Sequence, residues 1–184
     1  SAFTGADKGT AIHLILQKHD FSKKFTPEQV KAEISQLISQ NLLTPELVAE
    51  LDLTKLFEFL SSDFSQTITQ NVKSLKREQS FSSLVKARAI FKDFTDPTSD
   101  ILVHGTIDGY FKTPAGLVLF DYKTDQVKGD IAQARQQLIE NYQGQLNFYA
   151  KALTEITGEP VVAKYLIPLE LGELIELKNE TQGE

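Results

Sequence analysis

The chain is 184 residues long, with 41% hydrophobic and 24% charged residues and a formal net charge of −6. That length suits one domain with a sizeable core. The absence of cysteine excludes disulfide bonds and a cysteine-ligated iron-sulfur cluster. No run of about 20 apolar residues and no signal-peptide pattern occur, so we expect a cytoplasmic protein with no membrane association. Because no methionine occurs, even at position 1, we interpret the sequence as a domain cut from a longer chain.

Hydrophobic periodicity and capping residues divide the chain into a helical first part and a mixed second part. Helices are expected at residues 8–19 and 27–41 and, as shorter segments, within 45–71. Strands are expected at 74–92, 100–112 and 117–124, then helical segments at 130–139 and 141–157, then strands at 161–167 and 174–177. This order predicts an α/β fold, a mixed β-sheet with a central antiparallel hairpin flanked by helices. We expect one domain over residues 1–184, with a helical insertion at 20–72 and a core at 73–168.

The most informative segment is a predicted β-hairpin with the sequence GTIDGYFKTPAGLVLFDYKT, at residues 105–124. A turn centred on the Pro114–Ala115 bond places Asp108 opposite Asp121, because antiparallel partners keep a constant index sum. Directly opposed residues have Cβ atoms about 5 Å apart. Lys123 shares the face of Asp121, because side chains alternate along a strand. Two carboxylates and an ammonium group are therefore expected to converge.

Two facing carboxylates repel one another unless a cation lies between them. Mg²⁺ prefers oxygen ligands and keeps several waters, which suits Asp108, Asp121 and one backbone carbonyl, assigned to Tyr122. A metal held there can polarise a phosphoryl oxygen and activate a water, while Lys123 neutralises developing charge. The pattern therefore favours phosphodiester hydrolysis. The alternative is a solvated hairpin face on which Asp and Lys happen to alternate, and the pairing within the hairpin argues against it.

The pattern Asp108 followed by Asp121-Tyr122-Lys123 resembles the signature of the PD-(D/E)XK nuclease superfamily, and the surrounding sequence resembles its RecB-type branch. Gly9–His13 is similar to the N-terminal helix motif that supplies a histidine in this family. Gln145–Tyr149 matches its Q-x-x-x-Y helix. Within that branch the chain resembles the C-terminal nuclease domain of AddA/RexA-type helicase-nuclease proteins, which act in bacterial double-strand-break repair and recombination.

This resemblance implies a restriction-endonuclease-like core and a Mg²⁺-dependent deoxyribonuclease, with exonuclease action expected. It implies that His13 is a further metal ligand, and an imidazole ligand makes Mn²⁺ a good substitute for Mg²⁺. Gln145 and Tyr149 lie four residues apart on one helix face, and the resemblance implies that they position DNA and support Lys123. Related nucleases often carry a glutamate at the place of Glu78, near the metal. From the residues alone, His13 and Tyr149 would be structural and Glu78 a surface glutamate.

The other two histidines are weaker candidates for the metal site. His104 shares the strand face of Asp108 but lies four residues upstream. His19 ends the first predicted helix, where a cation suits the helix dipole.

The net charge of −6 is unexpected for a DNA enzyme, because affinity for DNA comes largely from phosphate neutralisation by Lys and Arg. One segment is locally basic, and its five cations are Lys73, Lys76, Arg77, Lys86 and Arg88. They indicate either a strip that follows phosphates or a strand edge guarded by lysines. In both cases helicase domains of the same full-length chain, with a second protein of the AddB/RexB type, would deliver single-stranded ends and supply the missing affinity.

The sequence therefore predicts a metal-dependent DNA nuclease domain of a helicase-nuclease. Two alternatives stay open: an acidic, catalytically inactive interaction module, and a stand-alone RecB-like exonuclease or phage-type recombination nuclease. An inactive relative would usually have lost an acid or the lysine, whereas Asp108, Asp121 and Lys123 are all present.

Overall fold

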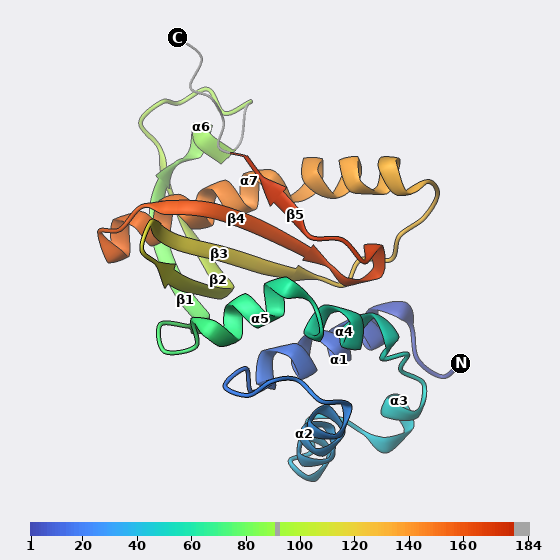
Figure 1. The fold of residues 1–184 in the computed structure, drawn as a ribbon. Coiled ribbons are helices and arrows are strands. Elements are labelled where there is room, and N and C mark those ends of the chain that lie inside the picture. The colour runs from blue at the N-terminus through green and yellow to red at the C-terminus, as the bar shows by residue number, and fades with distance from the viewer. Residues whose placement is uncertain (91–92, 179–184) are drawn as a thin grey trace.

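The computed structural model describes residues 1–90 and 93–178 and contains one five-stranded sheet in the spatial order β1-β2-β3-β4-β5 (Figure 1). The strands are β1 (Lys76–Lys86), β2 (Asp100–Thr113), β3 (Gly116–Lys123), β4 (Val161–Pro168) and β5 (Ile175–Leu177). β3 pairs antiparallel with β2 and parallel with β4, so the sheet is mixed as predicted. The parallel step needs a long crossover, which helix α7 (Ile131–Thr157) provides.

The predicted hairpin forms with the predicted register. Lys112 faces Leu117 and Gly109 faces Phe120, around a turn at residues 114 and 115. Gly116 follows the turn with φ +146°, and a Cβ there would meet the Pro160 carbonyl oxygen at 2.6 Å. Only glycine therefore allows β3 to start this close to the beginning of β4.

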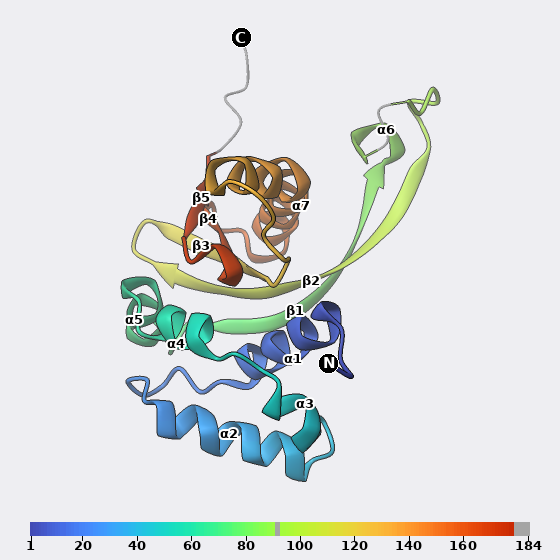
Figure 2. The same cartoon turned by 90° about the vertical axis from the view of Figure 1, so that its right-hand side faces the viewer.

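Helices cover both faces of the sheet, as Figure 2 shows. One face carries α7, which buries Leu146, Tyr149 and Leu153 against the sheet. The other face carries the N-terminal helices, packed on a core that includes Phe120 and Tyr122 of β3. These helices are α1 (Gly5–Lys18), α2 (Pro27–Ser39), α3 (Pro45–Ala49), α4 (Thr54–Leu60) and α5 (Asp63–Gln70). The residues predicted as a helical insertion, 20–72, thus hold four of these helices, while their status as an insertion in the family stays a prediction.

The largest differences from the prediction concern three elements. Helix α1 starts at Gly5 rather than at residue 8, because Thr4 caps it and exchanges hydrogen bonds with Asp7 in a capping box. Strand β1 ends at Lys86, and the short helix α6 (Ala87–Ile90) follows, where a strand to residue 92 was predicted; residues 91 and 92 lie outside the described part. The two helical segments predicted after residue 130 form the single helix α7, capped by Asp130 and ended by Gly158 at φ +72°.

A short 3₁₀ turn, Leu169–Leu171, joins β4 to β5. Among the residues described, no helix has the length and apolar character needed to cross a bilayer.

Candidate active site

The site lies where β2 and β3 separate. Their pairing ends at Gly109 and Phe120, and Asp108 and Asp121 occupy the next position on each strand. β2 remains paired with β1 beyond this point, so the two strands of the hairpin form a fork. Both aspartates are almost fully buried, with 5% and 4% of their surface exposed. The expectation that the two carboxylates meet therefore agrees with the geometry of the hairpin.

Glycines on both sides of Asp108 allow aromatic rings to pack against this strand. A Cβ at Gly109 would lie 2.1 Å from the Phe120 ring, and one at Gly105 would lie 2.6 Å from the Phe81 ring. Cβ atoms do not come that close to non-bonded atoms, so these positions require glycine. The strand around Asp108 is thereby fixed on both sides.

Asp108 is held by hydrogen bonds from two directions. The backbone N–H of Tyr122 donates to its Oδ2 at 2.8 Å, and His13 Nε2 lies 3.0 Å from its Oδ1. Burial acts to raise the pKa of Asp108, but hydrogen bonds from His13, Asp121 and the Tyr122 N–H hold that pKa below its usual value. Asp108 is therefore the carboxylate that stays ionised.

The pKa of Asp121 is shifted in the opposite direction to that of Asp108. Burial first, and then the adjacent Asp108, raise the pKa of Asp121 from 3.8 to about 8. Two carboxyl groups in contact cannot both ionise without a counter-ion, so a shared proton joins them when no metal is present. A divalent cation is the group that would allow both to be charged.

His13 reaches the site from α1. Gly9 lets this helix approach the end of β3, because a Cβ there would lie 2.8 Å from Thr124 Oγ1. Ala11, Ile15 and Leu16 of α1 are buried, and the His13 ring lies edge-on to the Tyr122 ring at 5.9 Å. The hydrogen bond to Asp108 raises the pKa of His13, so Asp108 and His13 stabilise one another where a metal would bind.

Glu78 completes the acidic group from β1. Its φ of +51° is unusual for a residue with a side chain, and Gln17 Nε2 donates to its Oε2 at 2.9 Å. Its Oε1 is buried and has no hydrogen-bond partner. Burial first, and then Asp108, raise the pKa of Glu78. An unpartnered buried carboxylate oxygen is costly, and a bound cation would satisfy it.

Within the described residues, no three His, Asp or Glu side chains already stand in the arrangement of a ligated metal. Asp108 is instead paired with His13, and Asp121 with Lys123. The donor set nevertheless fits a hard divalent ion, because it offers carboxylate oxygens and one imidazole. Tyr122 contributes its backbone N–H to Asp108, and ligation through its carbonyl stays a prediction.

Lys123 lies beside the carboxylates and is fixed from α7. Its Nζ is 2.9 Å from Asp121 Oδ2 and donates to Gln145 Oε1 at 2.9 Å. The same ammonium group lies 4.0 Å from the centre of the Tyr142 ring. The Tyr142 hydroxyl donates to Asp125 Oδ2 at 2.6 Å, which orients the ring. The structure thus brings Gln145 to Lys123, as the resemblance implied.

The comparisons with known proteins agree with this geometry. The family model of the PD-(D/E)XK nuclease superfamily matches residues 1–180. This chain belongs to that superfamily. It is 45% identical over 177 residues to an ATP-dependent helicase/nuclease protein of Lactobacillus helveticus, covering 96% of this chain and 15% of that protein. The protein with the same description from Enterococcus faecalis is 36% identical over 176 residues, covering 95% of this chain and 14% of that protein.

The chain therefore spans about one seventh of the length of these curated relatives. The resemblance to the nuclease domain of AddA-type helicase-nucleases is confirmed, and so is the α/β fold with a mixed sheet of the superfamily's nuclease type.

Tyr149, the second residue of the superfamily's Q-x-x-x-Y helix, lies deeper than Gln145. Its ring is buried edge-on to Phe81 at 5.4 Å. Burial first, and then the negative charges of Asp121 and Asp108, raise the pKa of Tyr149 to about 12. Its hydroxyl therefore interacts electrostatically with the two carboxyl groups. Tyr149 therefore packs as core while bordering the carboxylates.

The five cations predicted as a DNA-binding strip do not form one patch. Arg77 donates from its guanidinium to the main-chain oxygens of Leu16 and His19 at the end of α1, and the group lies 5.0 Å from the Phe21 ring centre. Lys86 pairs with Asp100 at 2.8 Å. Lys76 and Lys86 are ten residues apart on one strand, about 33 Å. Lys73, Lys76 and Arg88 are exposed, and their contact with DNA stays a prediction.

Sequence reasoning missed two partners of the site. Gln17 follows His13 by four residues on α1, and that spacing alone puts both on one helix face. Asp125 lies two residues beyond Lys123, but its bond to Tyr142 depends on the turn between β3 and α7. His19, a weaker candidate, is buried and bonds Glu33 of α2 at 2.8 Å, so it stabilises the helical layer.

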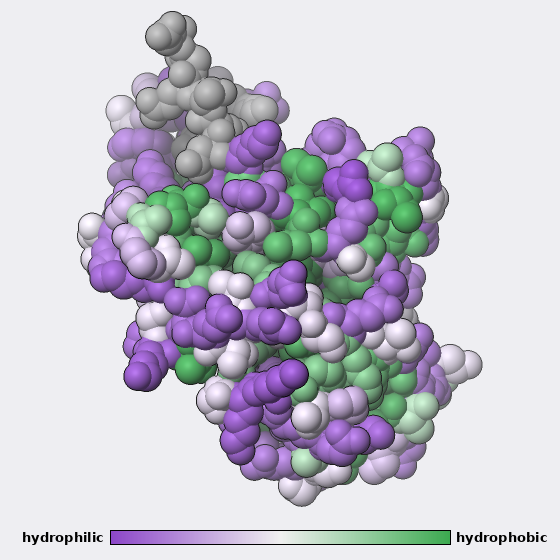
Figure 3. All heavy atoms as spheres, viewed as in Figure 1, coloured by the Kyte–Doolittle hydropathy of each residue, from purple (hydrophilic) through white to green (hydrophobic). Residues whose placement is uncertain are grey.

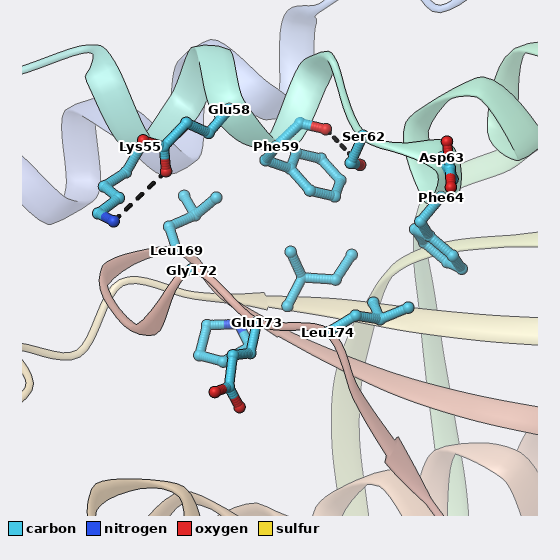
Figure 4. A pocket seen from close by; sticks show the side chains of 12 residues that line it. Lys55, Glu58, Phe59, Ser62, Asp63, Phe64, Leu169, Gly172, Glu173 and Leu174 are labelled. Carbon is cyan, nitrogen blue, oxygen red and sulfur yellow. Dashed lines mark hydrogen bonds and ion pairs between the residues drawn. The ribbon is translucent and has the colours of Figure 1, made fainter. Parts of the chain in front are cut away.

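A separate cavity of about 270 Å³ lies between α4, α5 and the end of β4, away from the carboxylates (Figure 4). Phe59, Phe64 and Leu174 line it, with Lys55 and Glu58 forming an ion pair at its edge. In Figure 3, apolar surface shows over this side of the molecule, interrupted by polar side chains. The cavity contains none of the residues that the superfamily signature identifies.

Proposed function

We propose that this chain hydrolyses phosphodiester bonds in DNA with a divalent metal, Mg²⁺ or Mn²⁺, as the nuclease module of a longer ATP-dependent helicase-nuclease. The observation that carries the proposal is the placement of two buried carboxyl groups, Asp108 and Asp121, at the same end of the β2–β3 pairing and beside the ammonium group of Lys123. An arrangement of this kind has no stabilising role in a fold without a cation, but it is suited to metal-assisted attack on phosphate.

Asp108, Asp121 and His13 would hold the metal, with Glu78 at its border. A metal bound there supplies Lewis-acid polarisation of the phosphate and lowers the pKa of a water. The Tyr122 N–H fixes the rotamer of Asp108, so this carboxylate is preorganised. Burial keeps bulk water away from both carboxylates, which strengthens every electrostatic interaction in the site.

Lys123 would act on the attacking water or on the phosphoryl oxygen that gains charge. Gln145 and the Tyr142 ring hold its ammonium group in one position, so little reorganisation is needed in the transition state. In the hydrolysis the water oxygen bonds to phosphorus, the bond to the leaving oxygen breaks, and the leaving oxygen takes a proton. Because Lys123 is a cation, it takes no part in ligating the metal.

We further propose that the domain acts on single-stranded ends in the bacterial cytoplasm, as an exonuclease. Helicase domains in the same full-length chain and a second protein of the AddB/RexB type would deliver those ends. The net charge of −6 predicts weak and salt-sensitive DNA binding by this domain alone, which makes delivery by partners necessary.

The test is cleavage of end-labelled single- and double-stranded DNA with Mg²⁺, Mn²⁺ or EDTA. Wild type should cut only with a divalent ion, and Asp108→Ala and Asp121→Ala should each abolish cutting. Glu155→Gln, at an exposed acid on α7, is the control and should cut like wild type. Near-normal cutting by either aspartate variant would refute the site, and no cutting by wild type under any condition would favour an inactive interaction module.

A further inference from the structure

The solvent face of the β1–β2 ribbon is not used by the site described above. Beyond Asp108 these strands stay paired and curve away from β3 (Figure 2). Their exposed side chains stand opposite one another in rows. The rows, in order from the site, are Ser80 with Thr106, Ser82 with His104, Leu84 with Leu102, and Lys86 with Asp100.

This face is continuous with the carboxylates. Glu78 and Asp108 lie between the Gln79–Ile107 and Arg77–Gly109 pairs, next along the ribbon, and both side chains contact residues of α1. The other face of the ribbon is occupied, since Phe81 and Ile107 pack with Tyr149 of α7. A strand of DNA that leaves the carboxylates along β2 therefore meets the exposed rows first.

The surface is hollowed over the two rows nearest the site. A depression of about 550 Å³ is lined by Ser80, Phe81, Ser82, His104, Gly105 and Thr106. Gly105 contributes only main-chain atoms to this depression, because a Cβ there would point to the opposite face, toward Phe81 and Tyr149. None of the three rows nearest the carboxylates contains an acid, in a chain whose net charge is −6.

The donors in this depression suit phosphate oxygens. Ser82 Oγ lies 2.7 Å from His104 Nδ1. When the hydroxyl donates to Nδ1, the neutral ring carries its proton on Nε2, the nitrogen that Ser82 does not bond. Ser80 and Thr106 add two hydroxyl groups. Such uncharged donors commonly bind the phosphate backbone and fix its register without reading bases.

We propose that Ser80, Ser82, His104 and Thr106 form a subsite for backbone phosphates of the DNA strand a few nucleotides from the scissile bond, with His104 Nε2 as the main donor. This proposal rests on the proposed function. His104 is four residues from Asp108, about 13 Å along the strand. That separation corresponds to about four nucleotide steps at ~3.4 Å each, and to fewer steps in an extended strand. His104 is thus a substrate-binding residue and does not ligate the metal.

The experiment compares wild type with His104→Ala and Ser82→Ala. Ser83→Ala, on the opposite face of the same strand, is the matched control. Two substrates are used with Mn²⁺: a single-stranded 20-mer, and the p-nitrophenyl ester of thymidine 5′-phosphate, which has one phosphodiester and does not reach the ribbon. Affinity for the 20-mer is also measured by fluorescence anisotropy in EDTA.

For the 20-mer, His104→Ala should lower kcat/KM about ten-fold through KM, with kcat unchanged, since a hydrogen bond to a charged group is lost. Ser82→Ala should lower it less, and affinity in EDTA should fall in parallel. All variants should hydrolyse the p-nitrophenyl ester like wild type, and Ser83→Ala should match wild type throughout.

Unchanged binding and hydrolysis of the 20-mer in His104→Ala would overturn the proposal and would be the result expected if the ribbon docks a protein instead. Equal losses on both substrates would also overturn it, because the substitution would then act on the metal site. If wild type hydrolyses neither substrate, the proposed function fails, and anisotropy in EDTA still decides the subsite by whether His104→Ala weakens binding.

Discussion

Replacing Asp121 by asparagine should make the metal-free protein more stable while abolishing its metal response. Asp121 is buried against Asp108, and its pKa is raised from 3.8 to about 8 by burial and by that neighbour. An acid of this kind binds more protons in the folded than in the unfolded state, so stability falls as pH rises from about 3.8 to about 8. At pH 7 the loss of stability caused by Asp121 has an upper limit of ~4 kcal/mol, because about three pH units separate 3.8 from 7 and each corresponds to ~1.4 kcal/mol.

The amide of Asp121→Asn has nearly the same size and donates a hydrogen bond to Asp108 without needing a proton. We expect the free energy of unfolding in EDTA at pH 7 to rise by about 1–3 kcal/mol. This is less than the upper limit, because burying the amide has a cost of its own. For a chain of this size that gain in stability raises Tm by about 2–12 °C. The gain should be small near pH 4 and largest at and above pH 8.

The assay is scanning calorimetry of wild type, Asp121→Asn and the exposed control Glu155→Gln, each in EDTA and in excess Mn²⁺. The free energy of unfolding of wild type should rise by ~2.7 kcal/mol when the free Mn²⁺ concentration is 100 times the Kd for Mn²⁺. That of Asp121→Asn should rise much less. A variant that is less stable than wild type in EDTA, or equally stabilised by Mn²⁺, would refute the reasoning that a cation separates these carboxylates.

Three further predictions concern single substitutions. Lys123→Ala should bind metal and DNA nearly normally but cleave about 10²-fold to 10³-fold more slowly, because one preorganised charge contact is lost; parallel losses of metal affinity would mean that Lys123 only balances the carboxylates. His13→Ala should weaken Mn²⁺ affinity at least ~10-fold by titration calorimetry while the domain stays folded in EDTA, and unchanged activity at limiting Mn²⁺ would show that it is structural. Arg77→Ala should lower the free energy of unfolding by about 1–3 kcal/mol, because two α1 carbonyls lose their donor, whereas exposed Lys76→Ala should change it by less than ~0.5 kcal/mol; a loss of DNA affinity without a loss of stability would restore Arg77 to the DNA-binding strip.

The centre of the site could be predicted because it depends on local register. The turn at Pro114 and Ala115 fixes every pair of the hairpin, so the meeting of Asp108 and Asp121 follows from counting along two strands. Helix α1 starts earlier than predicted although its signal, Thr4 followed by Asp7, stands in the sequence. That boundary could have been found from the capping box.

Other features depend on packing between distant segments and leave no local pattern. The sequence pattern of β1 predicts an exposed cation at Arg77. Its guanidinium instead donates hydrogen bonds to main-chain oxygens about 60 residues earlier in the chain. The positive φ of Glu78 is likewise set by the fork and by Gln17, since nothing in its neighbours requires it. The fork itself arises because β2 stays paired with β1 while β3 stays paired with β4. The register of the hairpin does not show where its two strands separate.

The central claim is that Asp108 and Asp121 hold a divalent metal beside Lys123. Anomalous diffraction from crystals of wild type grown with Mn²⁺ tests it most directly. We expect a manganese peak in contact with both carboxylates and with His13 Nε2, and no peak there in crystals of Asp121→Asn. A wild-type peak that touches neither carboxylate, or an unaltered peak in the variant, would contradict it.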